Sequence, residues 1–326
     1  MLLNPTYEVL FTSEVSTVRL MRFAISIPQY VGDGTFDPAA LRGYLTRAEE
    51  LGFDSAWTGE QLIGTIPHLS PIETLTYAAA CTERLRLGCA AFVSTLHNPV
   101  HLAKSLSTLD QLSRGRLEVG ITTGGRFRQF AAFGVEPDSF VARFTEGLRV
   151  MKALWTEDRV DLDGRFWQLS NVAMEPKPYQ KPHPPIWFGA TAPPSLHRAV
   201  RLGDGFFGAG SATTAQFTGH VRVIREALAE QGRDPATFRI AKRVYIAVDD
   251  DAARAQQRIA DALDAHYGYF GLTGLAPVAV AGTVDDCAKG LREVADAGAE
   301  LILLNPMFDD AEQVERLAAE VIPRLT

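Results

Sequence analysis

Three short segments rich in glycine and hydroxyl side chains are the clearest candidates for chemistry in this chain of 326 residues. They read TTGGR at 122–126, GAT at 189–191 and GAGSATT at 208–214. Glycine lets a backbone approach a flat ring closely, while hydroxyls and N–H groups at helix starts can hold a phosphate. The same residue types also make ordinary turns between strands and helices. Three such segments in one chain favour a large cofactor that carries phosphate.

Titratable side chains are scarce around these segments. Glu60 is a candidate catalytic residue that could donate or relay a proton, and its alternative role is a structural carboxylate bound to a neighbouring loop. His68, His97 and His101 are further candidates for a proton relay. A protein that offers few acids and bases leaves the difficult chemistry to its cofactor.

Other catalytic signatures are missing from the sequence. It has no H-x-H or H-E-x-x-H cluster, so we predict no metal site. It also lacks the G-x-S-x-G turn of serine hydrolases and a pair of carboxylates of the glycosidase type. The cysteines Cys81, Cys89 and Cys287 are widely spaced without a C-x-x-C pattern, which fits core packing in a reducing cytoplasm.

Composition and charge exclude several classes of function. The chain is 46% hydrophobic and 22% charged, with a net charge of −7 and no basic run, which argues against partners such as nucleic acid or a membrane surface. No apolar run approaches the roughly 20 residues of a membrane span. Residues 1–20 do not resemble a signal peptide, and we expect either a disordered extension or a start site assigned upstream of Met21. A single domain at 21–326 in the cytoplasm is expected to follow.

Short apolar runs alternate with helical segments along the chain. The helix at 37–52 is typical, with Asp37 as its N-cap, Pro38 in the first turn and Gly52 at its end. The predicted strands span 22–28, 53–59, 85–93, 116–122, 185–190, 204–209, 238–248 and 299–305. The predicted helices span 37–52, 70–84, 98–115, 139–158, 193–203, 213–232, 249–268, 283–298 and 309–325.

Eight strands that alternate with helices predict an α/β fold, a (β/α)8 TIM barrel. A doubly wound sheet is the alternative, but the first strand is followed by PQYVGDG and not by the G-x-G-x-x-G phosphate motif. Two insertions interrupt the alternation, one after the fourth helix and one before the last strand. The first is a hairpin at 159–175 with an Asp-Gly turn, followed by the proline-rich strap PKPYQKPHPPIWFGAT at 176–191, and the second is the glycine-rich 269–282.

Several segments resemble one protein family. They include AEELGFDSAWTGEQ at 48–61, NPVHLAKSLSTLDQLSRGRLEVGITTGG at 98–125, GRFWQL at 164–169 and the strap at 176–191. Together they identify the chain as similar to the luciferase-like flavin-dependent monooxygenases and oxidoreductases. The similarity covers nearly all of 21–325 and is greatest to the branch that uses the deazaflavin coenzyme F-420.

The resemblance implies a cofactor ring in the mouth of the barrel, and a homodimer. It implies that Gln29, Glu60, Ala90 and Ala91 line the ring, with a non-proline cis peptide near 89–91. Arg126 would add charge to the phosphate, or else be a solvated loop arginine. The residues expected to hold the ribityl chain and phosphate, or to lie beside them, are Thr122, Thr123, Gly124, Gly125, Gly189, Ala190, Thr191, Gly208, Ala209 and Gly210.

Three functions remain open at the level of sequence. The preferred one is hydride transfer between coenzyme F-420 and a small organic substrate. The first alternative is an FMN-dependent monooxygenase that inserts one oxygen atom from O2, and the second is a non-catalytic flavin-binding or partner subunit. Apolar and aromatic side chains at 62–70, 126–135 and 269–277 predict an apolar or mixed substrate.

Overall fold

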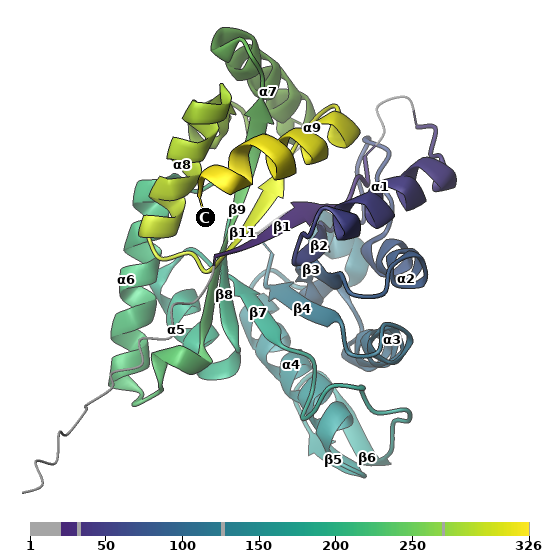
Figure 1. Ribbon diagram of the computed structural model, residues 1–326. Coiled ribbons are helices and arrows are strands. Elements are labelled where there is room, and N and C mark those ends of the chain that lie inside the picture. Colours follow the sequence, from purple (N-terminus) through teal and green to yellow (C-terminus); the bar gives the residue numbers. More distant parts are fainter. Residues whose placement is uncertain (1–20, 31–33, 125–127, 269–270, 326) are drawn as a thin grey trace, which may run out of the picture.

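The computed structural model describes residues 21–325 apart from 31–33, 125–127 and 269–270. The expectation for residues 1–20 therefore lies outside the described residues. Eight parallel strands close into a barrel through the pairing of β8 with β9, which confirms the predicted fold (Figure 1). These strands are β1 (Arg22–Ser26), β2 (Ser55–Thr58), β3 (Arg86–Val93), β4 (Leu117–Thr122), β7 (Ile186–Gly189), β8 (Gly205–Gly208), β9 (Arg239–Val248) and β11 (Leu301–Asn305).

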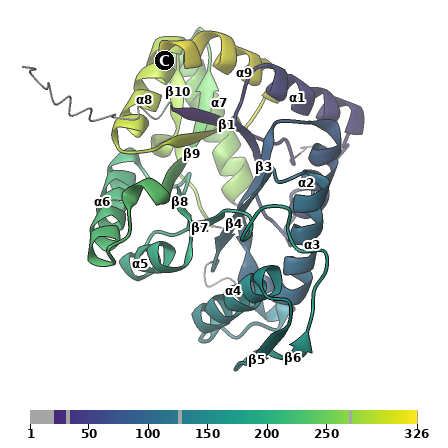
Figure 2. The same ribbon diagram turned by 60° about the horizontal axis from the view of Figure 1, so that its bottom comes forward.

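Helices surround the barrel on its outer side (Figure 2). Four of them start with proline in the first turn, where a missing N–H costs no intrahelical bond. The helices are α1 (Pro38–Glu50), α2 (Pro71–Cys81), α3 (Pro99–Leu112), α4 (Phe140–Thr156), α5 (Pro193–Leu202), α6 (Thr214–Glu230), α7 (Ala252–Tyr267), α8 (Val284–Asp296) and α9 (Asp310–Arg316). None of the described helices has the length and apolar character needed to cross a bilayer.

The last helix is shorter than predicted. A single helix was expected over 309–325, but α9 ends at Arg316 and continues as a π-helical segment, Leu317–Val321, and a 3-10 turn, Ile322–Arg324. Pro323 lies in that final turn, and a proline cannot donate the backbone hydrogen bond that a regular α-helix needs there.

The first insertion is a two-stranded hairpin, as predicted. Its strands β5 (Val160–Asp163) and β6 (Gln168–Val172) are antiparallel and project beyond α4, away from the barrel (Figures 1 and 2). Glu146 on α4 accepts hydrogen bonds from the backbone N–H groups of Phe166 at 2.8 Å and Trp167 at 3.0 Å, which holds the turn of the hairpin onto the helix.

The proline-rich strap then returns the chain to the barrel along α3. Ser107 donates a hydrogen bond to the carbonyl of Pro176 at 2.6 Å, and the side chain of Gln111 donates to that of Lys177 at 2.8 Å. Asp110 accepts from the backbone N–H of Gln180 at 2.8 Å. Side chains of α3 therefore satisfy a backbone that the prolines prevent from forming regular structure.

The second insertion contains a strand that the sequence did not predict. β10 (Val280–Gly282) lies within the glycine-rich 269–282 and pairs in parallel with residues 246–248 at the end of β9. It is only three residues long, so no apolar alternation marks it. It forms because β9 is ten residues long and extends past its barrel neighbours, leaving backbone groups to be paired.

Aromatic side chains fill the interior of the barrel below its mouth. The ring centroids of Trp57 and Phe207 are 4.8 Å apart, and those of Trp57 and Trp187 are 6.1 Å apart. The indole N–H of Trp187 donates to the buried carboxylate of Glu118 at 2.6 Å. Because this layer closes the lumen, a ligand can enter only the carboxyl ends of the strands above it.

Candidate active site

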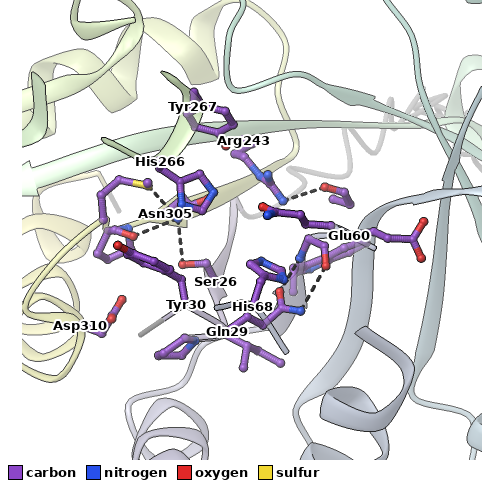
Figure 3. A pocket seen from close by; sticks show the side chains of 18 of the residues that line it. Ser26, Gln29, Tyr30, Glu60, His68, Arg243, His266, Tyr267, Asn305 and Asp310 are labelled. Carbon is purple, nitrogen blue, oxygen red and sulfur yellow. Dashed lines mark hydrogen bonds between the residues drawn. The ribbon is translucent and has the colours of Figure 1, made fainter. Parts of the chain in front are cut away.

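Two adjoining cavities lie at the carboxyl ends of the barrel strands. One, of about 240 Å³, is lined by Tyr30, His68 and His266 among others, and we call it the histidine cavity (Figure 3). The other, of about 370 Å³, is lined by the strand ends at 122–124, 189–191 and 208–211, and we call it the glycine cavity. The residues that line both cavities are Ala90, Ala91, Arg243 and Tyr267.

The glycine cavity brings together the residues expected to hold the cofactor tail. Each of them that the structure describes lines it, whereas Gly125 and Arg126 lie outside the described residues. Those in the wall are Thr122, Thr123, Gly124, Gly189, Ala190, Thr191, Gly208, Ala209 and Gly210. Their roles in binding remain predictions.

The chemistry of the glycine cavity fits a phosphate-bearing chain. Ser195, in the first turn of α5, lines it, and α6 begins directly beyond it with the N-cap Thr213. N-terminal helix turns carry partial positive charge from their N–H groups, which favours a bound anion. Gly210 is needed there because a Cβ atom would lie 2.6 Å from the ring of Tyr245.

The partition between the two cavities is the end of β3. The peptide bond between Ala90 and Ala91 is cis, which confirms the expectation of a non-proline cis peptide at this strand end. The pairing of β3 with β4 shifts register between Cys89 and Phe92. Arg243 on β9 donates from Nη2 to the carbonyl of Ala90 at 2.7 Å, so it fixes this partition from across the barrel.

Glu60 lies in the wall of the histidine cavity, but its carboxylate is engaged elsewhere. The side chain is 1% exposed, and one oxygen accepts a hydrogen bond from the backbone N–H of Val93 at 2.6 Å. The other oxygen lies 2.8 Å from Nε2 of His97. The contacts are with the last residue of β3 and with the turn that follows it, so the geometry favours the structural role over proton transfer to a substrate.

Replacing Glu60 by glutamine is therefore expected to lower stability more than turnover. Glutamine keeps an oxygen that can accept from the N–H of Val93, but its NH2 group then faces Nε2 of His97, which must be in the tautomer that accepts. Loss of the carboxylate charge also weakens both contacts, and together we expect a cost of about 1–3 kcal/mol. Urea unfolding measures that loss, and Glu226→Gln on exposed α6 is the control. A turnover loss of 100-fold with unchanged stability would show that Glu60 is catalytic after all.

Gln29, expected beside the cofactor ring, joins the loops that follow β1 and β2 in the wall of the histidine cavity. It is 4% exposed, and its oxygen accepts from the N–H of Gly59 at 2.6 Å. Its amide nitrogen donates to the carbonyls of Leu69 at 2.9 Å and Gly59 at 3.1 Å. The carboxamide thus aligns the ends of β1 and β2 with the segment that leads into α2.

Two histidines face each other across the histidine cavity. The ring centroids of His68 and His266 are 6.4 Å apart, and Nδ1 of each ring is buried without a hydrogen-bond partner. Burial, and more weakly the neighbouring His68 and Arg243, lower the pKa of His266 to about 4. Burial also lowers the pKa of His68, so both rings are neutral at pH 7 and can accept a proton.

The sequence proposed His68 but missed His266. His266 lies in the last turn of α7, and not after a barrel strand where catalytic groups were sought. Tyr30 packs edge-on against its ring with centroids 5.5 Å apart, which places the start of the first loop against the end of the seventh helix. The signal in the sequence is weak: an aromatic cluster, HYGYF, begins there.

Two cations of β9 were also missed as site residues. Arg243 lies between the two cavities, and its Nε atom is buried without a partner. Lys242 donates to the carbonyl of Ala209 at 2.7 Å, beneath the glycine cavity. Burial lowers its pKa to about 8, with a smaller contribution from Arg243. Nothing in their residue type distinguished them from surface charges.

Asp310 supplies a second carboxyl group to the histidine cavity, on the opposite side from Glu60 (Figure 3). It is the first residue of α9. Burial, and to a smaller extent the neighbouring Asp309, raise its pKa to about 6. The group is therefore mostly ionised at pH 7 but gains a proton in mildly acidic solution.

Replacing Asp310 by asparagine is expected to stabilise the protein at pH 8 and not near pH 4. Because the folded-state pKa exceeds the usual value of 3.8, the folded state binds more protons between about pH 4 and 6. Stability from this group is therefore lost as pH rises through that window, by about 1–3 kcal/mol. Urea unfolding at pH 4.5, 6 and 8 measures the gain, and a constant difference between variant and wild type would contradict it.

Comparison with known proteins now assigns the chain to a family. The profile of the luciferase-like monooxygenase family matches residues 21–301, so the chain belongs to this family and is an oxidoreductase. An F-420-dependent glucose-6-phosphate dehydrogenase of Kineococcus radiotolerans is 30% identical over 68% of this chain and 67% of its own length.

Other relatives use a different cofactor or reaction. An FMNH2-dependent dimethylsulfone monooxygenase of Pseudomonas putida is 33% identical, over 41% of this chain and 38% of that protein. The crystal structure of monooxygenase RslO1 from Streptomyces bottropensis superposes with a TM-score of 0.80 and 26% identity, covering 94% of this chain and all of that one. The family therefore includes both dehydrogenases and monooxygenases.

Proposed function

We propose that this protein transfers hydride between the deazaflavin coenzyme F-420 and a small organic substrate. The observation that carries this proposal is the pairing of two cavities of different chemistry at one barrel mouth. The glycine cavity offers glycine, hydroxyls and helix starts to a phosphate-bearing tail, and the histidine cavity offers two neutral imidazoles. The similarity to the dehydrogenase of Kineococcus radiotolerans supports the choice of coenzyme.

In this proposal the cofactor ring lies against the partition at Ala90 and Ala91, which both cavities share. The tail follows the strand ends at 122–124, 189–191 and 208–210. Arg243 has a buried Nε without a partner, so it has a donor left for a polar edge of the ring or of the substrate. This orphaned donor and the open glycine-rich wall are what a flat, polar-edged cofactor with a phosphate tail requires.

The cofactor supplies the hydride chemistry, and the protein supplies orientation and proton transfer. When an alcohol is oxidised, its C–H bond gives up a hydride and its O–H proton must go to a base. His266 or His68 can serve as that base, because both rings line the cavity and are neutral at pH 7. The neutral rings suit the oxidation direction, because reduction of a carbonyl substrate would need a ring that is already protonated.

The second candidate function is an FMN-dependent monooxygenase. The similarity to the sulfone monooxygenase and to monooxygenase RslO1 supports it. In this alternative FMN would occupy the same two cavities, because its ring and tail resemble those of the deazaflavin. The two candidate functions are therefore distinguished by which cofactor the protein binds.

Purified protein titrated separately with F-420 and with FMN tests the choice, by following quenching of cofactor or protein fluorescence. We expect F-420 to bind at least tenfold more tightly than FMN. Tight binding of FMN with no binding of F-420 would refute hydride transfer from the deazaflavin and support the monooxygenase. Binding of neither cofactor would refute both assignments.

The homodimer expected from the resemblance stays a prediction, which light scattering can check.

A further inference from the structure

A third cavity lies beside the histidine cavity, at the same end of the barrel. Its volume is about 490 Å³, and the first turns of α1, α2 and α9 surround it. Its described walls are formed largely by apolar side chains, and we call it the apolar annex. These side chains include Phe36, Leu41, Tyr44, Leu69 and Tyr77.

The tyrosines of the annex present their rings and not their hydroxyl groups. Tyr44 donates from its hydroxyl to the carbonyl of Ser26 at 2.9 Å, and Tyr77 donates to that of Pro38 at 2.7 Å. Both polar atoms are thereby satisfied by backbone. The half-buried Phe36 and Leu41 complete an apolar surface, and covering this surface with an apolar group of a ligand lowers the free energy of binding.

The annex adjoins the place where we propose that the substrate reacts. Pro28 and Asp310 line both the annex and the histidine cavity, so the two volumes adjoin at these side chains. Leu69 is held at this border, because Gln29 donates to its carbonyl. A ligand whose reacting group lies near His266 could therefore extend into the annex past the end of β1.

The charges of the histidine cavity limit the kind of reacting group it can hold. Among the described residues of its wall, Arg243 is the single side chain that is cationic at pH 7, and it already donates to Ala90. Asp310 adds a carboxylate, and the two histidines are neutral. A phosphate monoester carries nearly two negative charges and is commonly bound by several cations or helix starts. This wall provides one cation, Arg243, and one helix start, at Asp310, whose own carboxylate repels a second anion.

We propose that the substrate combines a neutral polar group that reacts in the histidine cavity with an apolar extension that occupies the annex. This inference rests on the proposed function for its reacting group and names the substrate class: an alcohol or carbonyl compound with a hydrocarbon side chain, and not a phosphorylated sugar. The annex supplies most of the affinity, since burial of hydrocarbon is worth about 0.8 kcal/mol for each methylene.

A homologous series of 2-alkanols tests the annex without any turnover. We expect affinity for the protein, measured by calorimetry, to tighten about three- to fourfold for each added methylene from 2-butanol upward. Ala40→Trp places an indole in the annex, because Ala40 lines it from α1. In that variant the gain with chain length should disappear. Ala39→Trp is the matched control, since Ala39 is its exposed neighbour and does not line the annex.

The outcomes separate this inference from the proposed function. If affinity rises equally with chain length in wild type and in Ala40→Trp, the proposed role of the annex is wrong. It is also wrong if affinity does not rise with chain length in wild type, even if F-420 binds. Tighter binding of glucose 6-phosphate than of any alkanol would overturn the neutral reacting group. If the gain is present and blocked in Ala40→Trp but F-420 does not bind, the proposed function fails and the annex remains. Circular dichroism verifies that both tryptophan variants are folded.

Discussion

Replacing Gly120 by alanine is expected to destabilise the barrel by about 3 kcal/mol or more. A Cβ atom at this buried position of β4 would lie 2.0 Å from the carbonyl oxygen of Cys89 on β3. The obstacle is backbone, so no side-chain rotation can relieve it. The strand would have to move at the point where β3 shifts register beside Ala90 and Ala91, and such strain is among the large causes of destabilisation.

The control for this prediction is Gly43→Ala on the exposed side of α1. A Cβ there meets no atom within 4 Å, and alanine is the better helix former, so we expect a gain of about 0.5–1 kcal/mol. Thermal and urea unfolding of both variants measure the difference. Wild-type stability of Gly120→Ala would show that the end of β3 adapts and is not held in place by β4.

Replacing His266 by glutamine is expected to reduce turnover about 100-fold or more and leave F-420 affinity within threefold. Loss of a positioned base typically lowers rates by about 10²–10⁴. In the proposed arrangement the cofactor tail lies in the glycine cavity, which His266 does not line. The loss of deazaflavin fluorescence on reduction follows turnover, with an alcohol selected from the binding series. His101→Gln, exposed on α3, is the matched control and should behave as wild type.

The pH profile of the wild-type enzyme tests the same role by a second route. Burial favours the neutral ring of His266, so its pKa lies at about 4 and not near 6.5. Proton acceptance by this ring should therefore be constant from pH 8 down to about 5 and fall only as pH approaches 4. A loss of rate centred near pH 6.5 would indicate a solvated histidine. Full turnover in both His266→Gln and His68→Gln would remove the pair from the mechanism.

Much of the fold could be predicted from the sequence because its signals are local. The proline and Asp or Asn at helix starts, as at Asp37 and Asn98, act within one turn, and both side chains cap their helices in the structure. Apolar runs separated by helices then imply parallel strands. The three-residue strand β10 was missed because its cause is the overhanging end of β9, which is distant in sequence.

The site was predicted in part for a related reason. Parallel barrel strands all end at one face, so strand-end residues such as Gly189 and Gly208 had to converge, and they do. The role of Glu60 could not be decided in this way, because the partners of its carboxylate, Val93 and His97, lie more than thirty residues away.

By itself the sequence determined the order of strands and helices, the two insertions and the row of glycine and hydroxyl residues at the strand ends. It did so because turn, cap and strand preferences depend on neighbours in the chain. Only the tertiary structure brought His266 opposite His68, set Arg243 between two cavities and placed the apolar annex beside them. Burial and charge at these positions arise from elements that meet only when the barrel closes, and they decide which groups are neutral and which are free to react.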